Sequence, residues 1–132
     1  AAPINLEWAY DNRTTGIRIP LSGPQARRVE NRVAGMDCNP YIGIAASLAC
    51  GYLGLNNQDQ PRAQFSGDAY AGEGDIPGGV SPALNKFDSA MALHEIIGPE
   101  FARVYSIVKR AEYEEFLQVI SPWEREHLLL NV

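Results

Sequence analysis

The residues with the clearest chemical potential are four arginines and one glutamate that lie close together near the start of the sequence. They are Arg13, Arg18, Arg28, Glu30 and Arg32. Guanidinium groups bind phosphate and carboxylate oxygens in bidentate fashion and stay charged at any relevant pH. The chain as a whole is acidic, with a formal net charge of −5. Cations gathered in an acidic chain therefore predict a local anion site.

Glu30 has two interpretations within this cluster. It can form structural ion pairs with Arg28 and Arg32, or it can coordinate a divalent cation that bridges phosphate groups. Alternating charges on a strand are commonly an ordinary solvated face, so the pattern alone favours the ion pairs. Spacing alone does not decide between the two.

A pair of antiparallel strands is predicted at about 15–33, where it positions these charges. Two short alternating runs, Gly16–Ile19 and Arg28–Val33, flank a connector that is rich in turn residues. Successive side chains of a strand point to opposite faces. The second run therefore gathers its charges, including Glu30, on one face.

Four helices are predicted to follow the strand pair. Their ranges are about 40–54, 82–95, 100–120 and 122–130. Asn39 before a proline caps the first of them, and Ser121 begins a capping box for the last. The first helix is apolar on several faces, which predicts a buried helix. Strands followed by helices predict an α+β fold, in one segment over 1–132.

Residues 56–80 have no sustained periodicity of apolar residues, which predicts a long surface loop of unidentified role.

The composition is that of an ordinary soluble domain, 45% hydrophobic and 20% charged. The acidic balance argues against nucleic acid and anionic membranes as partners. Cys38 and Cys50 fit reduced thiols, which predicts the cytoplasm. The first residue is alanine and not methionine, which suggests a start within a longer reading frame.

Three blocks of the sequence resemble consecutive blocks of the glutamine synthetase family. They are Asp11–Pro20, Ala26–Arg32 and Asn39–Tyr41, the last with the alanine-rich helix that follows it. The resemblance covers nearly the whole chain. It implies the C-terminal part of the family's catalytic domain, with a guanido-kinase-like fold, in an oligomeric ligase of nitrogen metabolism. The implied reaction is ATP-dependent phosphorylation of the glutamate γ-carboxylate, followed by attack of ammonia or an amine on γ-glutamyl phosphate.

The resemblance also implies a role for each clustered residue. Glu30 matches the family's metal-ligand glutamate, which would hold Mg²⁺ or Mn²⁺. Arg18 and Arg28 match arginines that hold ATP phosphates. Arg13 matches an arginine near the transferring phosphoryl group, and Arg32 matches one that contacts the glutamate substrate.

The sequence also departs from the family pattern. Gln25 stands where many relatives have lysine, which puts a cationic contact with the nucleotide in doubt. Thr14, Thr15 and Asn31 resemble the γ-glutamylpolyamine or γ-glutamylputrescine synthetase branch more than the ammonia-using enzymes.

The rest of the family's site is not found in this sequence. It needs a Glu-x-Glu strand, a histidine metal ligand and an ammonia-site acid, which the resemblance assigns to the remainder of the catalytic chain and to homo-oligomer partners. The isolated segment is therefore expected to be inactive. The alternatives are a non-catalytic interaction or regulatory module that keeps the fold, and an anion-binding domain that uses no metal.

Overall fold

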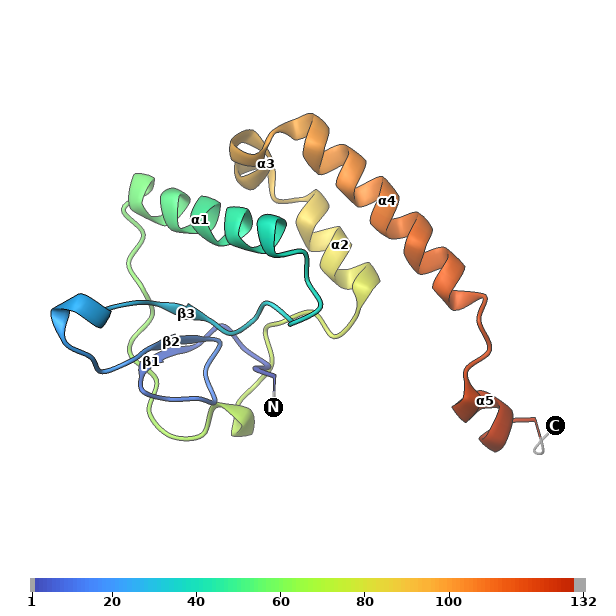
Figure 1. The fold of residues 1–132 in the computed structure, drawn as a ribbon, viewed down its shortest axis with the longest axis horizontal. Helices are drawn as coiled ribbons and strands as arrows, with labels where there is room; N and C mark the ends of the chain where they lie inside the picture. The colour runs from blue at the N-terminus through green and yellow to red at the C-terminus, as the bar shows by residue number, and fades with distance from the viewer. Residues whose placement is uncertain (1, 130–132) are drawn as a thin grey trace. The chain divides into compact units, whose positions relative to one another are not determined.

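A computed structural model describes residues 2–129. The chain divides into two compact units, Ala1–Gly78 and Gly79–Val132. The first unit contains a small sheet and one long helix, and the second contains helices (Figure 1). The predicted α+β class is therefore confirmed. None of the described helices is both long and apolar enough to cross a membrane.

The sheet of the first unit has three short strands in the order β1-β2-β3. They are Trp8–Tyr10, Ile17–Ile19 and Glu30–Asn31. Strands β2 and β3 are antiparallel, with Arg18 opposite Glu30, so the predicted strand pair is confirmed. Strand β3 is shorter than the run that predicted it. Strand β1, which runs parallel to β2, was not predicted.

The link between β1 and β2, residues 11–16, is short for a connection between parallel strands, which usually takes a dozen residues or more. Asp11 begins it with a left-handed φ of 49°, a conformation that Asp tolerates better than most residues. The Asn12 side chain then accepts a hydrogen bond from the Thr14 amide at 2.9 Å, which closes a local turn. Thr15 is fully buried, and its hydroxyl donates to the Ile17 carbonyl at 2.9 Å. This compact link carries Arg13.

The long loop after the first helix holds that link in place. Its regular structure is a single short turn of 3-10 helix, η2, at Ala69–Ala71. Asn12 Nδ2 donates to the Gly67 carbonyl at 2.8 Å, and the Ala69 amide donates to Thr14 Oγ1 at 2.8 Å. Earlier in the loop, the Phe65 amide donates to the Trp8 carbonyl at 3.0 Å. The loop therefore frames the residues that precede β2.

Helix α1, Pro40–Asn56, begins as predicted. Asn39 caps it by accepting hydrogen bonds from the Tyr41 and Ile42 amides, and proline occupies the first turn. The predicted burial of this helix is wrong, because Ala49 is its one buried residue. The described part of the chain covers only one side of α1, which Figure 1 shows as the green helix beside β3.

The second unit is built from α2, α3, α4 and α5, which span Val80–Asp88, Met91–Ile97, Pro99–Leu117 and Pro122–His127. Helices α2 and α4 run antiparallel and side by side, with α3 at the turn between them (Figure 1). Leu84 of α2 and Ala102 of α4 are buried. The predicted capping box is present, because Ser121 Oγ accepts from the Glu124 amide at 3.1 Å and a Glu124 carboxylate oxygen accepts from the Ser121 amide at 2.7 Å.

The sequence predicts one helix over 82–95, but the structure has two in this region. The backbone leaves the helical conformation at Ala90, where φ is −83° and ψ is 61°. Ser89 Oγ donates to the Lys86 carbonyl at 2.9 Å, which satisfies one of the last carbonyls of α2. Serine competes with a helix in this way through local hydrogen bonds. The predicted gap between the helices over 82–95 and 100–120 is present at Gly98, which has a φ of 96°.

Candidate functional site

The centre of the candidate site is a row of charges across strands β2 and β3. Arg18 Nη1 donates to Glu30 Oε2 at 2.7 Å, and Arg18 Nη2 donates to Asp11 Oδ1 at 2.6 Å. The second oxygen of Glu30, Oε1, accepts from Arg28 Nε at 3.0 Å and lies 2.9 Å from Arg28 Nη2. One carboxylate is therefore held between two guanidinium groups.

Exposure increases along this row. The side chain of Arg18 is 13% exposed, that of Glu30 is 30% exposed and that of Arg28 is 53% exposed. The hydrogen bond from Arg18 lowers the pKa of Glu30 although partial burial opposes it, and the same bond raises the pKa of Arg18. Arg18 is thus the fixed end of the row, and Arg28 is the end that an incoming anion can reach.

The lowered pKa of Glu30 gives a prediction for acid stability. Because this pKa lies below its ordinary value of 4.5 in the folded chain, the ionised carboxylate stabilises the fold above pH 4.5, and this contribution is lost as the pH falls through the lowered pKa. NMR titration of the Glu30 carboxyl should show the lowered pKa, and Glu30→Gln should flatten the acid limb of a stability-against-pH curve. A Glu30 midpoint at or above 4.5 would contradict the geometry.

Arg32 and Arg13 form a second group, separate from this row. Arg32 Nη1 donates to the carbonyl oxygens of Arg13 and Thr15, the latter at 3.0 Å. Arg32 therefore holds the link between β1 and β2, and no ion pair joins it to Glu30 among the described contacts. Arg13 itself is exposed. The structure thus brings Arg18, Glu30 and Arg28 together, and it connects Arg32 to Arg13 through the backbone.

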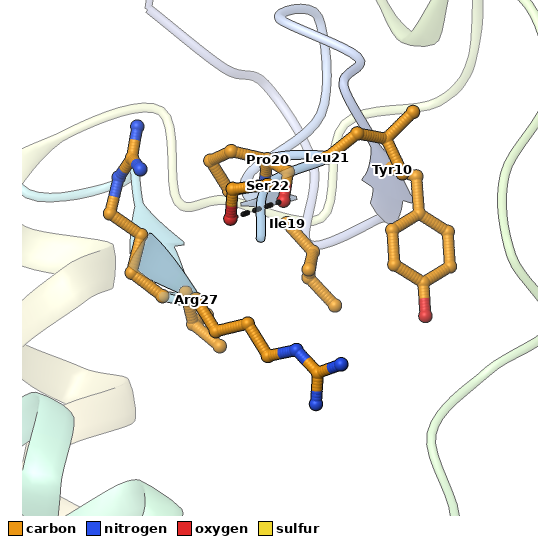
Figure 2. Close-up of a pocket in the computed structure, with 8 residues that line it drawn as sticks. Tyr10, Ile19, Pro20, Leu21, Ser22 and Arg27 are labelled. Carbon is orange, nitrogen blue, oxygen red and sulfur yellow. Dashed lines mark hydrogen bonds between the residues drawn. The ribbon is translucent and has the colours of Figure 1, made fainter. Parts of the chain in front are cut away.

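A pocket of about 660 Å³ opens beside Arg28. Its lining residues are Tyr10, Ile19, Pro20, Leu21, Ser22, Arg27, Arg28 and Val29. Figure 2 shows the Tyr10 ring on one side, Arg27 on the other and Ile19 between them. An aromatic ring and guanidinium groups around one hollow suit a planar ligand that carries negative charge.

Two of these lining residues, Tyr10 and Arg27, were not predicted as site residues. Arg27 stands next to Arg28 in the sequence, but the alternating pattern places it on the other face. Tyr10 belongs to β1, which was missed. Trp8 and Tyr10 could have indicated this strand, since aromatic side chains favour strands.

The described residues do not by themselves fit a divalent cation. Among residues 2–129 no group of three or more His, Cys, Asp or Glu side chains is placed to hold a metal ion. Both oxygens of Glu30 are engaged by arginines, and Asp11 is paired with Arg18. Mg²⁺ and Mn²⁺ prefer several oxygen ligands. Each carboxylate oxygen of Glu30 has a second lone pair, so Glu30 would be able to contribute to a cation site, but the further ligands would have to come from outside the described residues.

Comparison with known proteins gives a family match over nearly the whole chain. The model of the family described as "Glutamine synthetase, catalytic domain" matches residues 1–128. Gamma-glutamylputrescine synthetase PuuA of Escherichia coli is 35% identical over 130 residues, which cover 98% of this chain and 28% of that protein. Glutamine synthetase of Methanocaldococcus jannaschii is 28% identical over 138 residues, which cover 98% of this chain and 30% of that protein.

A third relative carries an amine in its name. The glutamate–isopropylamine ligase of a Pseudomonas species is 33% identical over 124 residues, which cover 91% of this chain and 27% of that protein. The chain therefore spans between about a quarter and a third of the length of these relatives.

Proposed function

The chain belongs to the glutamine synthetase catalytic-domain family, and from that premise we propose that it forms part of the active site of an ATP-dependent ligase. The ligase joins the γ-carboxylate of glutamate to ammonia or an amine through γ-glutamyl phosphate. The observation that carries the proposal is the row Arg18–Glu30–Arg28 beside the pocket with Tyr10 and Arg27. In this proposal the pocket and its arginines receive the nucleotide.

Each arginine has a distinct task in the proposed site. Arg28 is the exposed cation that contacts ATP phosphates, and Arg18 is the inner cation that sets the position of Glu30 and adds charge behind it. Arg13 faces the transferring phosphoryl group and the substrate carboxylate. Arg32 supports Arg13 by holding the carbonyls of its turn, in addition to the glutamate contact that the family resemblance implies. Fixed cations of this kind stabilise the charge of a phosphoryl-transfer transition state.

Of the two acceptors, ammonia and an amine, the proposal favours an amine. Two of the relatives, gamma-glutamylputrescine synthetase and glutamate–isopropylamine ligase, are named for amines, and Thr14, Thr15 and Asn31 resemble that branch. The proposal includes a cytoplasmic ligase of nitrogen metabolism, a guanido-kinase-like fold and homo-oligomer partners.

The proposed site is composite, and the isolated chain is inactive. A divalent cation supplies charge neutralisation to ATP phosphates in such ligases, but the described residues contribute Glu30 as a single ligand. Further oxygen ligands have to come from the remainder of the catalytic chain or from another subunit. The chain's own contribution is to hold and orient anionic groups.

Nucleotide binding by the isolated chain tests the proposal. Glu30 forms ion pairs with Arg18 and Arg28. Glu30→Gln removes this negative charge, so it should free guanidinium donors and strengthen binding of metal-free ATP by roughly threefold to tenfold. Isothermal titration in the presence of EDTA measures this. Glu7→Gln is the matched control, because Glu7 also pairs with an arginine, Arg62 at 2.8 Å, yet does not line the pocket beside Arg28. The control should bind as the unaltered chain does.

The same titration separates the rival functions. If neither the unaltered chain nor Glu30→Gln binds ATP, the non-catalytic interaction module is favoured and the proposed site is wrong. A second titration uses the chain together with the rest of the ligase and adds Mg²⁺. If Glu30→Gln strengthens ATP binding there too, the chain is an anion-binding domain that uses no metal. The proposal expects the opposite, that Glu30→Gln weakens binding of the Mg²⁺–ATP complex.

A further inference from the structure

A second pocket of the first unit has an acidic lining and a volume of about 400 Å³. Its lining residues are Asn5, Glu7, Arg62, Phe65, Gly72, Glu73, Gly74 and Asp75. It shares none of them with the pocket beside Arg28. Pockets that bind small molecules usually measure about 300–1,000 Å³, so this one is large enough for a small ligand. We refer to it as the Asn5 pocket.

One bridging arginine holds the walls of the Asn5 pocket together. Arg62 Nη1 lies 2.8 Å from Glu7 Oε1, and Arg62 Nη2 lies 2.8 Å from Asp75 Oδ2. The Arg62 carbonyl accepts a hydrogen bond from Trp8 Nε1 at 2.7 Å. The hydrogen bond from Arg62 also lowers the pKa of Asp75, although partial burial opposes it. The single positive charge of the lining is therefore already offset by two carboxylates.

Two acceptors of the lining have no donor among residues 2–129. Asn5 is 2% exposed and donates through Nδ2 to the Ala69 carbonyl at 2.8 Å, but its buried Oδ1 accepts no hydrogen bond. Glu73 is exposed and forms no ion pair within that range. The two are neighbours, because a Cβ at Gly72 would lie 3.8 Å from Asn5 Nδ2. A buried acceptor without a donor costs free energy, so a ligand that donates to Asn5 Oδ1 has an advantage here.

The charges of the lining select a cation as that ligand. Three carboxylates and one guanidinium leave two negative charges in excess. An alkylammonium group has three N–H donors and no acceptor, which matches the unpartnered oxygens of Asn5 and Glu73. The Phe65 ring offers apolar surface to a carbon chain, and its face attracts positive charge. A metal ion is a poorer match, because no group of three His, Cys, Asp or Glu side chains in the described part of the chain is placed to hold one.

We propose that the Asn5 pocket binds a small primary organic ammonium ion. Its N–H groups donate to Asn5 Oδ1 and to the Glu73 carboxylate, and its carbon chain packs against Phe65. Arg62 keeps Glu7 and Asp75 in place, so these two acids shape the site and add negative charge. The pocket contains none of the residues assigned to the proposed ligase reaction, so this inference does not depend on that reaction.

NMR titration of the 132-residue chain with propylammonium chloride tests the proposal. Replacement of sodium chloride by the ligand keeps the ionic strength constant, so a general attraction of cations to an acidic chain produces no signal. The side-chain amide of Asn5 and the backbone amide of Glu73 should shift and then saturate. Tetramethylammonium has the same charge but no N–H donor, so it should bind at least about tenfold more weakly.

A charge-removing variant locates the binding site. Glu73→Gln should weaken propylammonium binding by roughly threefold to tenfold, because it removes the one lining charge that Arg62 does not offset. Asp59→Asn is the matched control: it removes a negative charge from an exposed position of the same unit, and Asp59 does not line the pocket. The control should bind as the unaltered chain does, and circular dichroism should show the same fold for all three proteins.

Three results would overturn the proposal. Unchanged Asn5 signals would mean that water satisfies Oδ1 and that no ammonium ion enters. Equal binding of propylammonium and tetramethylammonium, or equal weakening by Glu73→Gln and Asp59→Asn, would show attraction to overall charge and no specific site. Since none of these measurements involves ATP, a failure here is distinct from a failure of the nucleotide-site proposal.

Discussion

Replacing Gly16 with alanine is expected to destabilise the first unit by about 3 kcal/mol. This is near the upper end of the usual cost of adding a methyl group where the structure has no room for it. A Cβ at this position would lie 2.4 Å from the Asn5 carbonyl oxygen and 3.3 Å from Val33 Cγ2. The Asn5 backbone has little room to retreat, because Asn5 is 2% exposed and its side chain donates to the Ala69 carbonyl at 2.8 Å. Gly16 also immediately precedes β2, so any shift moves Arg18.

Chemical denaturation measures this effect. Trp8 lies in β1, so its fluorescence reports on the first unit once Trp123 has been replaced by phenylalanine. Gly51→Ala is the matched control, because a Cβ at Gly51 of α1 has nothing within 4 Å. Alanine is favoured over glycine inside a helix by roughly 0.5–1 kcal/mol, so the control should be slightly stabilised. Equal midpoints for the two variants would contradict the steric account.

Local chemistry made part of this fold predictable. Asn39 before proline and Ser121 with Glu124 fix helix starts through hydrogen bonds within a few residues, so their outcome depends little on distant parts of the chain. The antiparallel strand pair was also predictable, because the alternation and the turn-rich connector lie within one short stretch. The pairing of Arg18 with Glu30 follows from the register of that pair.

Features that depend on distant contacts were not predictable. Strand β1 is three residues long and pairs in parallel across a short link, so its own pattern is weak. The bond from Arg32 to the turn of Arg13 arises from the way the link folds back, which spacing does not reveal. The apolar pattern of α1 predicted a buried helix, and this prediction is wrong because the described residues cover only one side of the helix.

Replacing Arg18 with glutamine is expected to have the largest effect on catalysis. Arg18 holds Glu30 at 2.7 Å and Asp11 at 2.6 Å, and its side chain is 13% exposed. Glutamine cannot reach both carboxylates or offset their charge, so Glu30 loses the contact that fixes its position. In a chimaera in which residues 1–128 of this chain replace the matching segment of E. coli gamma-glutamylputrescine synthetase, amine- and glutamate-dependent phosphate release should fall by roughly 10²- to 10³-fold, the usual effect of losing one preorganised charge-stabilising group.

Two companion variants distinguish a site effect from a folding defect. Arg18→Lys keeps the charge but not the two-pronged donor geometry, so its activity should lie between those of the unaltered chimaera and Arg18→Gln. Arg28→Gln leaves the pairing of Arg18 with Glu30 intact, so it should raise the KM for ATP by about tenfold with a smaller change in kcat. Full activity in Arg18→Gln, or equal losses in all three variants together with a lowered melting temperature, would show that the row supports the sheet and not phosphoryl transfer. Activity that falls from the unaltered protein to Arg18→Lys and again to Arg18→Gln, with unchanged melting temperatures, requires Arg18 to act through its fixed geometry. This is the role that its position at the inner end of the row predicts.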